Sequence, residues 1–234
     1  MQTIGLVAGL SWESSVEYYR IINEQVREKL GGLHSAQIAM YSVDFEPIEE
    51  MQHCGKWDEQ VEILAGAARA VEAAGAGFFL ICSNTMHKIA DEVAARVRIP
   101  LLHIVRTTAS QVLSSGVKTV GLLGTKFTME ESFYRDGLGA AGLETVVPNI
   151  EERQMVHEII YSELCRGVTR EESKSTMIKV IAELVDRGSQ GIILGCTEIP
   201  LLIKQEDVPV PVFDTTRIHA VAAVELALRN HSVT

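Results

Sequence analysis

The chain has 234 residues, which is enough for one large domain or two small ones. Hydrophobic residues make up 47% and charged residues 22% of the sequence, a composition typical of a globular protein with a sizeable core. The formal net charge of −10 argues against a nucleic-acid-binding surface, so we expect no nucleic-acid partner. An anionic ligand would need local hydrogen-bond donors that overcome this negative field.

Hydropathy and cysteine spacing suggest a cytoplasmic protein without membrane association. No apolar run approaches the ~20 residues that span a bilayer, and the segment from Thr3 reads as a strand rather than a basic leader, so we expect no targeting segment. The cysteines make no C-x-x-C pair, which indicates neither a zinc site nor a redox dithiol. We therefore expect no metal and free thiols at Cys54, Cys82, Cys165 and Cys196.

Short apolar runs alternate with longer helical patterns along the chain. This alternation predicts parallel α/β units, and continuous apolar strands indicate a sheet covered by helices on both faces. The predicted strands are Thr3–Val7, Ala36–Ser42, Phe78–Cys82, Leu101–His103, Thr119–Leu123, Gly142–Val147, Gly191–Leu194 and Val212–Phe213. The predicted helices are Trp12–Leu30, Trp57–Ala74, Asn84–Val97, Ile104–Ser115, Met129–Ala140, Glu152–Arg166, Arg170–Arg187 and Thr215–Arg229.

The sequence also repeats itself. Residues 5–20 parallel residues 121–135, and residues 77–85 parallel residues 191–198, which places Ser83 opposite Cys196. We therefore predict two similar Rossmann-like domains with parallel sheets, related by pseudo-two-fold symmetry, with the active site in the cleft between them. Residues 1–98 with 210–234 should form the first domain, and residues 99–209 the second.

Ligands of open α/β sheets bind at the carboxyl ends of the strands. Four predicted strand ends are rich in small polar residues, and backbone N–H groups at the helix starts could bind a carboxylate there. Cys196 follows one of these strands and precedes a helix-like stretch, a position expected to lower its pKa from ~8.5. A buried structural cysteine is the alternative reading. The four ends are residues 8–11, 82–85, 124–128 and 195–198.

Five motifs in order resemble those of the aspartate/glutamate racemase superfamily, over essentially the whole chain. Ser83-Asn-Thr-Met-His87 is similar to the family's Cys-Asn-Thr-x-His, and Gly195-Cys-Thr-Glu198 to its Gly-Cys-Thr-Glu. The other three are the glycine-rich start at residues 4–13, Gly124-Thr125 through Thr128, and Phe213-Asp214-Thr215.

The resemblance implies a cofactor-independent racemase of a small dicarboxylic amino acid, aspartate or glutamate, that forms a homodimer. In such enzymes two groups flank the Cα atom on opposite faces, and hydrogen-bond donors stabilise the developing enediolate. It implies that Cys196 is catalytic and that the substrate is bound by Asn84, Thr85, Thr197, Leu10, Ser11, Gln52 and Thr125.

One position departs from the family pattern. Ser83 stands where most members have the first cysteine, and serine is a poor base at neutral pH. Cys82 should point to the opposite side of the strand and cannot replace it. In this respect the chain resembles members that carry threonine there and act from the L-enantiomer. We predict an asymmetric enzyme in which Cys196 is the base toward the L-substrate and Ser83 is the donor on the opposite face.

Two other functions and several local roles stay open. A single aligned cysteine also occurs in decarboxylases of the same superfamily, and loss of one thiol would also fit a catalytically silent amino-acid-binding protein. Gln52 could be a solvated helix residue. His87 could support the first motif or simply pack in the core, and Glu198 could activate Cys196 or complement a helix dipole.

Overall fold

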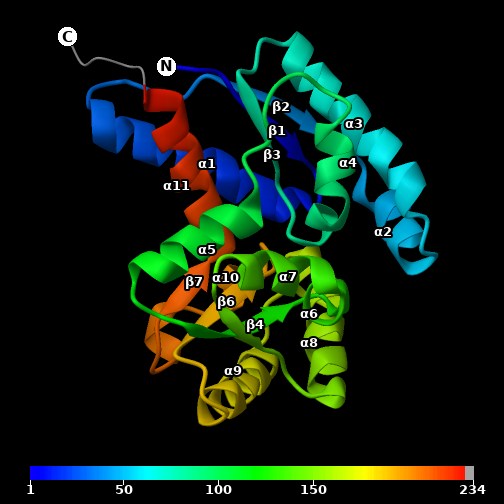
Figure 1. Ribbon diagram of the computed structural model, residues 1–234, viewed down its shortest axis with the longest axis vertical. Coiled ribbons are helices and arrows are strands. Elements are labelled where there is room, and N and C mark those ends of the chain that lie inside the picture. Colours follow the sequence, from blue (N-terminus) through cyan, green and yellow to red (C-terminus); the bar gives the residue numbers. More distant parts are fainter. Residues whose placement is uncertain (230–234) are drawn as a thin grey trace. The chain divides into compact units, whose positions relative to one another are not determined.

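The computed structural model describes residues 1–229 and divides the chain into two compact units (Figure 1). The first unit comprises Met1–Ile104 and the chain from His219 onward, and the second comprises Val105–Ile218. Both boundaries lie later in the sequence than we predicted. The last strand hydrogen-bonds within the second sheet, so residues 210–218, expected in the first domain, belong to the second unit.

The first unit is built on a three-stranded parallel sheet of order β2-β1-β3. The predicted strand at Leu101–His103 is reduced to a single bridge between Leu101 and Phe79. The elements are β1 (Ile4–Ala8), α1 (Trp12–Leu30), β2 (Ile38–Ser42), α2 (Phe45–His53), α3 (Trp57–Ala73), β3 (Phe78–Ile81), the 3₁₀ helix η1 (Thr85–Ile89) and α4 (Ala90–Ala94), with the later part of α11 (Thr215–Leu228).

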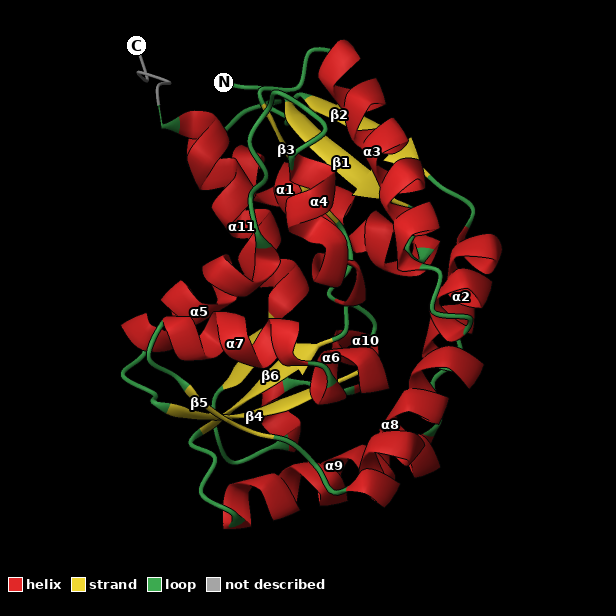
Figure 2. Ribbon diagram, turned by 45° about the vertical axis from the view of Figure 1, so that its right-hand side comes forward, coloured by secondary structure: helices red, strands yellow, loops and turns green. Residues whose placement is uncertain are grey.

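Helices cover both faces of this sheet, as the apolar strands predicted. Alternate residues of β1 and β3 face opposite sides. Leu6 and Leu80 belong to a core cluster with α1 and α11, whereas Val7 and Ile81 belong to a cluster with α3 and α4. Figure 2 shows α3 and α4 on one side of the strands and α1 on the other.

The second unit is built on a four-stranded parallel sheet of order β5-β4-β6-β7. The helices α8 and α9 pack on one face around Leu123, Ile192 and Leu194, and Figure 2 shows α5 and α7 on the opposite face. The elements are α5 (Ile104–Ser114), β4 (Thr119–Gly124), α6 (Lys126–Glu130), α7 (Ser132–Ala140), β5 (Glu144–Val146), α8 (Ile150–Ser162), η2 (Leu164–Arg166), α9 (Glu171–Asp186), β6 (Gly191–Gly195), α10 (Ile199–Leu202), η3 (Gln205–Asp207) and β7 (Val212–Asp214).

These two parallel sheets confirm the predicted α/β fold class. The helix α1 has the bounds predicted for it, whereas α2 was not predicted, and the segment expected as one helix at Met129–Ala140 is divided into α6 and α7 by extended backbone at Glu131. No helix within residues 1–229 is both long enough and apolar enough to cross a membrane.

Candidate active site

All nine residues predicted for the active site are buried, with exposed fractions between 2% and 7%. Polar side chains rarely occupy such positions unless they have partners or a function. Six lie in the first unit, five of them just after β1 or β3 and Gln52 on α2, and three lie in the second unit after β4 and β6. The first group is Leu10, Ser11, Gln52, Ser83, Asn84 and Thr85, and the second is Thr125, Cys196 and Thr197.

Pairing of β1 with β3 brings the residues of the first group other than Gln52 to one sheet edge. Val7 and Ile81 are register partners, so the turns that follow the two strands begin side by side. Gly9 has φ of 84°, and a Cβ atom there would lie 2.3 Å from the backbone oxygen of Val43. Only glycine allows this approach, which directs the chain toward Leu10 and Ser11.

The Ser83 turn begins where β3 ends. The N–H of Met86 lies 3.5 Å from the Ser83 hydroxyl oxygen, and the Nδ1 atom of His87 lies 2.7 Å from the Ser83 carbonyl oxygen. Cys82 points the other way, as predicted: it is fully buried in the α1 and α11 cluster, where burial raises the pKa of its thiol. Cys82 therefore lies on the other side of the strand from Ser83.

Gln52 is buried at 2% exposure, which rules out the solvated alternative. Its Nε2 atom lies 3.1 Å from the Sδ atom of Met86, so α2 packs directly on the 3₁₀ helix that follows Ser83. The sequence around Gln52 did not indicate that it is buried, because its burial depends on where α2 packs.

Two glycines set the geometry of the second group. Gly124 and Gly195 are register partners at the ends of β4 and β6, so Thr125 and Cys196 are the next residues on adjacent strands. A Cβ atom on Gly124 would lie 2.7 Å from the Gly195 carbonyl oxygen, and one on Gly195 would lie 2.8 Å from that of Leu123. The small residues therefore permit the close approach of the two strand ends.

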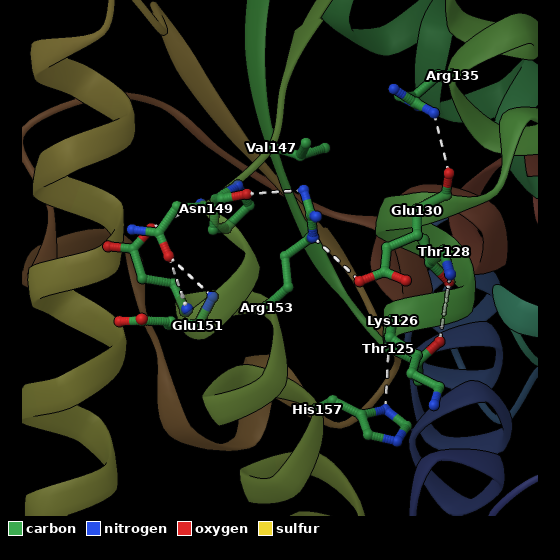
Figure 3. A network of polar contacts seen from close by, with 12 residues as sticks. Thr125, Lys126, Thr128, Glu130, Arg135, Val147, Asn149, Glu151, Arg153 and His157 are labelled. Atoms are coloured by element: carbon green, nitrogen blue, oxygen red, sulfur yellow. Dashed lines mark hydrogen bonds and ion pairs between the residues drawn. The ribbon is translucent and has the colours of Figure 1, made fainter.

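Thr125 is held by a polar network that links α6 to α8 (Figure 3). Its hydroxyl caps α6 by accepting a hydrogen bond from the N–H of Thr128 at 3.4 Å. The backbone N–H of Lys126, the residue after Thr125, donates to Nδ1 of His157 on α8. Arg153, also on α8, pairs with Glu130 of α6 at 3.1 Å. The threonine hydroxyl oxygen is thus used for capping, and it also lies 3.4 Å from the Thr128 hydroxyl oxygen.

Cys196, Thr197 and Glu198 form a compact hydrogen-bonded group after β6. The thiol of Cys196 and the hydroxyl of Thr197 both donate to Oε2 of Glu198, each at 2.9 Å. Glu198 is itself 2% exposed. This contact supports the activating role for Glu198 over the helix-dipole alternative, and it shows that the Thr197 hydroxyl, expected to donate to a substrate carboxylate, donates to Glu198 instead.

The expected lowering of the Cys196 pKa is wrong. Burial and the neighbouring charge of Glu198 raise the pKa of this thiol well above its ordinary value. The helix expected to lower it, α10, has only four residues and begins at Ile199, three positions later. Its dipole is too short and too distant to offset desolvation. Cys196 is therefore a thiol with a carboxylate acceptor rather than a preformed thiolate.

Glu13, in the first turn of α1, was not among the predicted site residues. Its Oε2 atom is buried and has no hydrogen-bond partner within residues 1–229. A buried carboxylate oxygen without a donor is costly, which makes it an acceptor suited to a cationic ligand group.

No group of three or more histidine, cysteine or acidic side chains in the described part of the chain is arranged to hold a metal ion.

Comparison with known proteins identifies the family. A family model described as Asp/Glu/hydantoin racemase matches residues 7–223. The chain belongs to this family. A crystal structure from Yersinia pestis, described as that of a candidate Asp/Glu racemase, is 49% identical with a TM-score of 0.90, and the match covers 97% of this chain and 100% of that one. An aspartate racemase homologue from Pyrococcus horikoshii OT3 is 39% identical with a TM-score of 0.84, over 97% and 99% of the two chains.

A more distant relative is described as a racemase of broad specificity. The broad specificity amino-acid racemase RacX of Bacillus subtilis (strain 168) is 22% identical over 234 residues, which cover 98% of this chain and 100% of that protein. Membership confirms the predicted superfamily and an enzyme of the isomerase class.

Proposed function

We propose that this chain is a cofactor-independent amino-acid racemase in which Cys196 and Ser83 act on opposite faces of the substrate Cα atom. The observation that carries the proposal is the buried contact between the Cys196 thiol and Glu198, at a strand end of a racemase-family chain. Ser83 occupies the corresponding position after β3 in the other unit. Our proposal requires that the two turns confront each other across one substrate.

On the first face, Glu198 supplies the base that the buried thiol lacks. Its carboxylate takes the thiol proton as the sulfur removes the α-proton of the L-substrate, so the thiol is re-formed and Glu198 holds one proton. If Cys196 protonates the same face, Glu198 gives its proton back to the sulfur and the starting state is restored. If Ser83 completes the reaction, Glu198 releases its proton to the hydroxide that is left when Ser83 recovers a proton from water. A raised thiol pKa makes the thiolate a stronger base, which helps it to attack the very weakly acidic α-proton.

On the second face, Ser83 delivers a proton to the planar intermediate and recovers one from water. Delivery from this side inverts Cα, whereas return from Cys196 restores the L-enantiomer. A neutral hydroxyl is a much poorer base than a thiolate, so proton transfer on the Ser83 face is the slower step, and solvent exchange at Cα should be slower for the D-substrate than for the L-substrate. The proposal therefore includes a preference for the L-enantiomer.

Polar groups at the strand ends would hold the substrate. Asn84 and Thr85 follow Ser83 directly and would donate to the α-carboxylate as it gains enediolate character. Leu10, Ser11 and Thr125 would complete the binding site, with Gln52 closest to the side chain. We assign the buried oxygen of Glu13 to the α-ammonium group, because an ammonium would supply the hydrogen bond that this oxygen lacks.

For the substrate we propose aspartate or glutamate, in keeping with the relatives named above. The broad specificity of RacX makes a panel of amino acids the appropriate test. The chain should be incubated in deuterium oxide with each L-amino acid, and α-deuteration and D-enantiomer formation measured. Exchange that disappears in Cys196→Ala supports the proposal, and absence of exchange with every amino acid refutes it.

A decarboxylase is the second candidate, because Cys196 is the single cysteine at the two motif positions. The same samples should be incubated with substituted malonates, and release of carbon dioxide without α-deuteration of any amino acid would select that function. Calorimetric binding of an amino acid with neither reaction would select a binding protein.

A further inference from the structure

Three histidines and a tyrosine form a cluster in the first unit, outside the residues assigned above, and only His103 of the four is not fully buried. The ring centroids of His87 and His103 are 4.6 Å apart, and those of His87 and His219 are 6.0 Å apart. Tyr18 contacts His219 edge to face at 5.7 Å. His87, His219 and Tyr18 are buried at 4%, 0% and 0% exposure. Titratable groups buried together at such distances usually have a fixed set of partners.

His87 joins two backbone segments. Its Nδ1 atom lies 2.7 Å from the carbonyl oxygen of Ser83, and its Nε2 atom lies 3.1 Å from the amide nitrogen of Ile104, which donates to it. A carbonyl only accepts and an amide N–H only donates, so His87 must be neutral with its proton on Nδ1. Burial and the two neighbouring histidines lower its pKa well below 6.5, in agreement with this state.

His219 holds the same segment from the other side. Its Nε2 atom lies 2.8 Å from the carbonyl oxygen of Leu102, and its Nδ1 atom lies 2.9 Å from the hydroxyl of Tyr18. Residues 102–104 are the point at which the chain leaves the first unit, and His219 is the residue at which it returns. Both histidines therefore fix the connecting segment to the body of the unit that carries Ser83.

We propose that His87 is a positioning residue that holds the Ser83 turn against the connecting segment and thereby sets the rate of proton delivery by Ser83. The inference rests on the proposed function. A serine hydroxyl is only weakly acidic, so the rate at which Ser83 delivers a proton depends strongly on the position of its oxygen. A shift of ~1 Å in a reacting group can lower the rate ~100-fold. The Cys196 step is made by the other unit and should be largely independent of His87.

Two substitutions separate the two hydrogen bonds. In His87→Asn the side-chain NH₂ group can replace Nδ1–H and keep the bond to Ser83, while the bond from Ile104 is lost. In His87→Gln the side-chain oxygen can replace Nε2 and keep the bond from Ile104, while the bond to Ser83 is lost. Val26→Ala, in the fully buried core of the same unit, is the control for loss of stability alone.

The readout is the ratio of inversion to exchange without inversion, measured on one L-substrate in deuterium oxide. Deuterated D-product reports delivery from the Ser83 face, and deuterated L-substrate reports return from Cys196. We expect His87→Gln to lower the ratio by about tenfold or more, His87→Asn to lower it less, and Val26→Ala to leave it unchanged. An unchanged ratio in both folded His87 variants would overturn the inference while the proposed function stands.

Absence of exchange in the unsubstituted chain would instead refute the proposed function, and the inference with it. Nitrogen-15 NMR of the histidine rings in the unsubstituted chain tests the same point if the variants do not fold. We expect His87 as the neutral Nδ1–H tautomer between pH 6 and 8. The Nε2–H tautomer, or a protonated ring in that range, would overturn the assignment.

Discussion

The Sγ atom of Cys196 lies 2.9 Å from Oε2 of Glu198, and both side chains are buried. This pair joins two opposing effects. The carboxylate accepts the thiol proton, yet its charge, added to burial, raises the pKa of the thiol. The chemistry we propose needs both effects. The raised pKa makes the Cys196 thiolate a strong base, and Glu198 must be in contact with the thiol to take its proton when that thiolate forms.

Glu198→Gln separates these effects. Removal of the negative charge should lower the pKa of Cys196 and speed its alkylation by iodoacetamide at pH 8, whereas α-proton exchange should fall by about 100-fold because the acceptor is lost. Peptide mapping would identify the alkylated cysteine, and a Cys54→Ser background removes the exposed thiol. Slower alkylation of Cys196 in the variant would contradict this account.

Ser83→Cys should restore a second thiol at the first motif. We expect exchange of the D-enantiomer to rise by about tenfold or more relative to that of the L-enantiomer, because a thiolate is a far better base than a hydroxyl. Exchange rates of both enantiomers in deuterium oxide give the ratio. Cys82→Ala is the matched control: its thiol lies in the core on the other side of the strand, and its removal should not change the ratio. An equal ratio of D- to L-enantiomer exchange in Ser83→Cys and the parent would contradict the asymmetric mechanism.

Glu13→Gln tests the assigned ammonium contact. Loss of the charge should raise KM for the amino acid by about tenfold with a smaller effect on kcat, since a hydrogen bond to a charged group contributes about 1.5–3 kcal/mol. Steady-state kinetics with the best substrate of the panel would measure both. Glu17→Gln is the control on the same helix, because Glu17 pairs with Arg20 at the surface. An unchanged KM in Glu13→Gln would exclude the contact.

Acid should destabilise the fold through its buried histidines. Burial lowers the pKa of His219 to about 3, from 6.5 in the unfolded chain. Between these values the unfolded state binds more protons, so His219 stabilises the fold fully above pH 6.5 and loses that contribution as the pH falls toward 3, by about 1.4 kcal/mol per pH unit. Urea unfolding at pH 7.5 and 5.5 should show a smaller loss in His219→Gln than in the parent. Equal losses would mean that His219 is not buried in its neutral form.

Gly9→Ala should disrupt the turn after β1. The positive φ and a Cβ atom 2.3 Å from a backbone oxygen leave no room for a side chain, so we expect a loss of more than about 2 kcal/mol in the free energy of unfolding. Gly66→Ala, inside α3, should be neutral or stabilising by up to about 1 kcal/mol, because a Cβ atom there would meet only the end of the Arg69 side chain, at 4.0 Å. Equal unfolding midpoints of the two variants would refute the steric argument.

The sequence by itself was sufficient for features that depend on local pattern. The bounds of α1, the strands that precede Ser83 and Cys196 and the parallel α/β class follow from residue order and periodicity, and the resemblance of five short motifs indicated the family. These signals are strong because strand-end turns and apolar runs are read over a few neighbouring residues. They also placed Cys82 in the core, since adjacent strand residues point to opposite faces.

Only the tertiary structure decided what surrounds each group. Helix α2, with a proline in its first turn, was not predicted, and its packing is what buries Gln52. The expected pKa of Cys196 had the wrong direction, because burial and the side chain of Glu198 outweigh a short helix. The partners of His87 and His219 are separated by up to 201 positions along the chain. Electrostatics and hydrogen bonding depend on distance in space, which a local pattern does not contain.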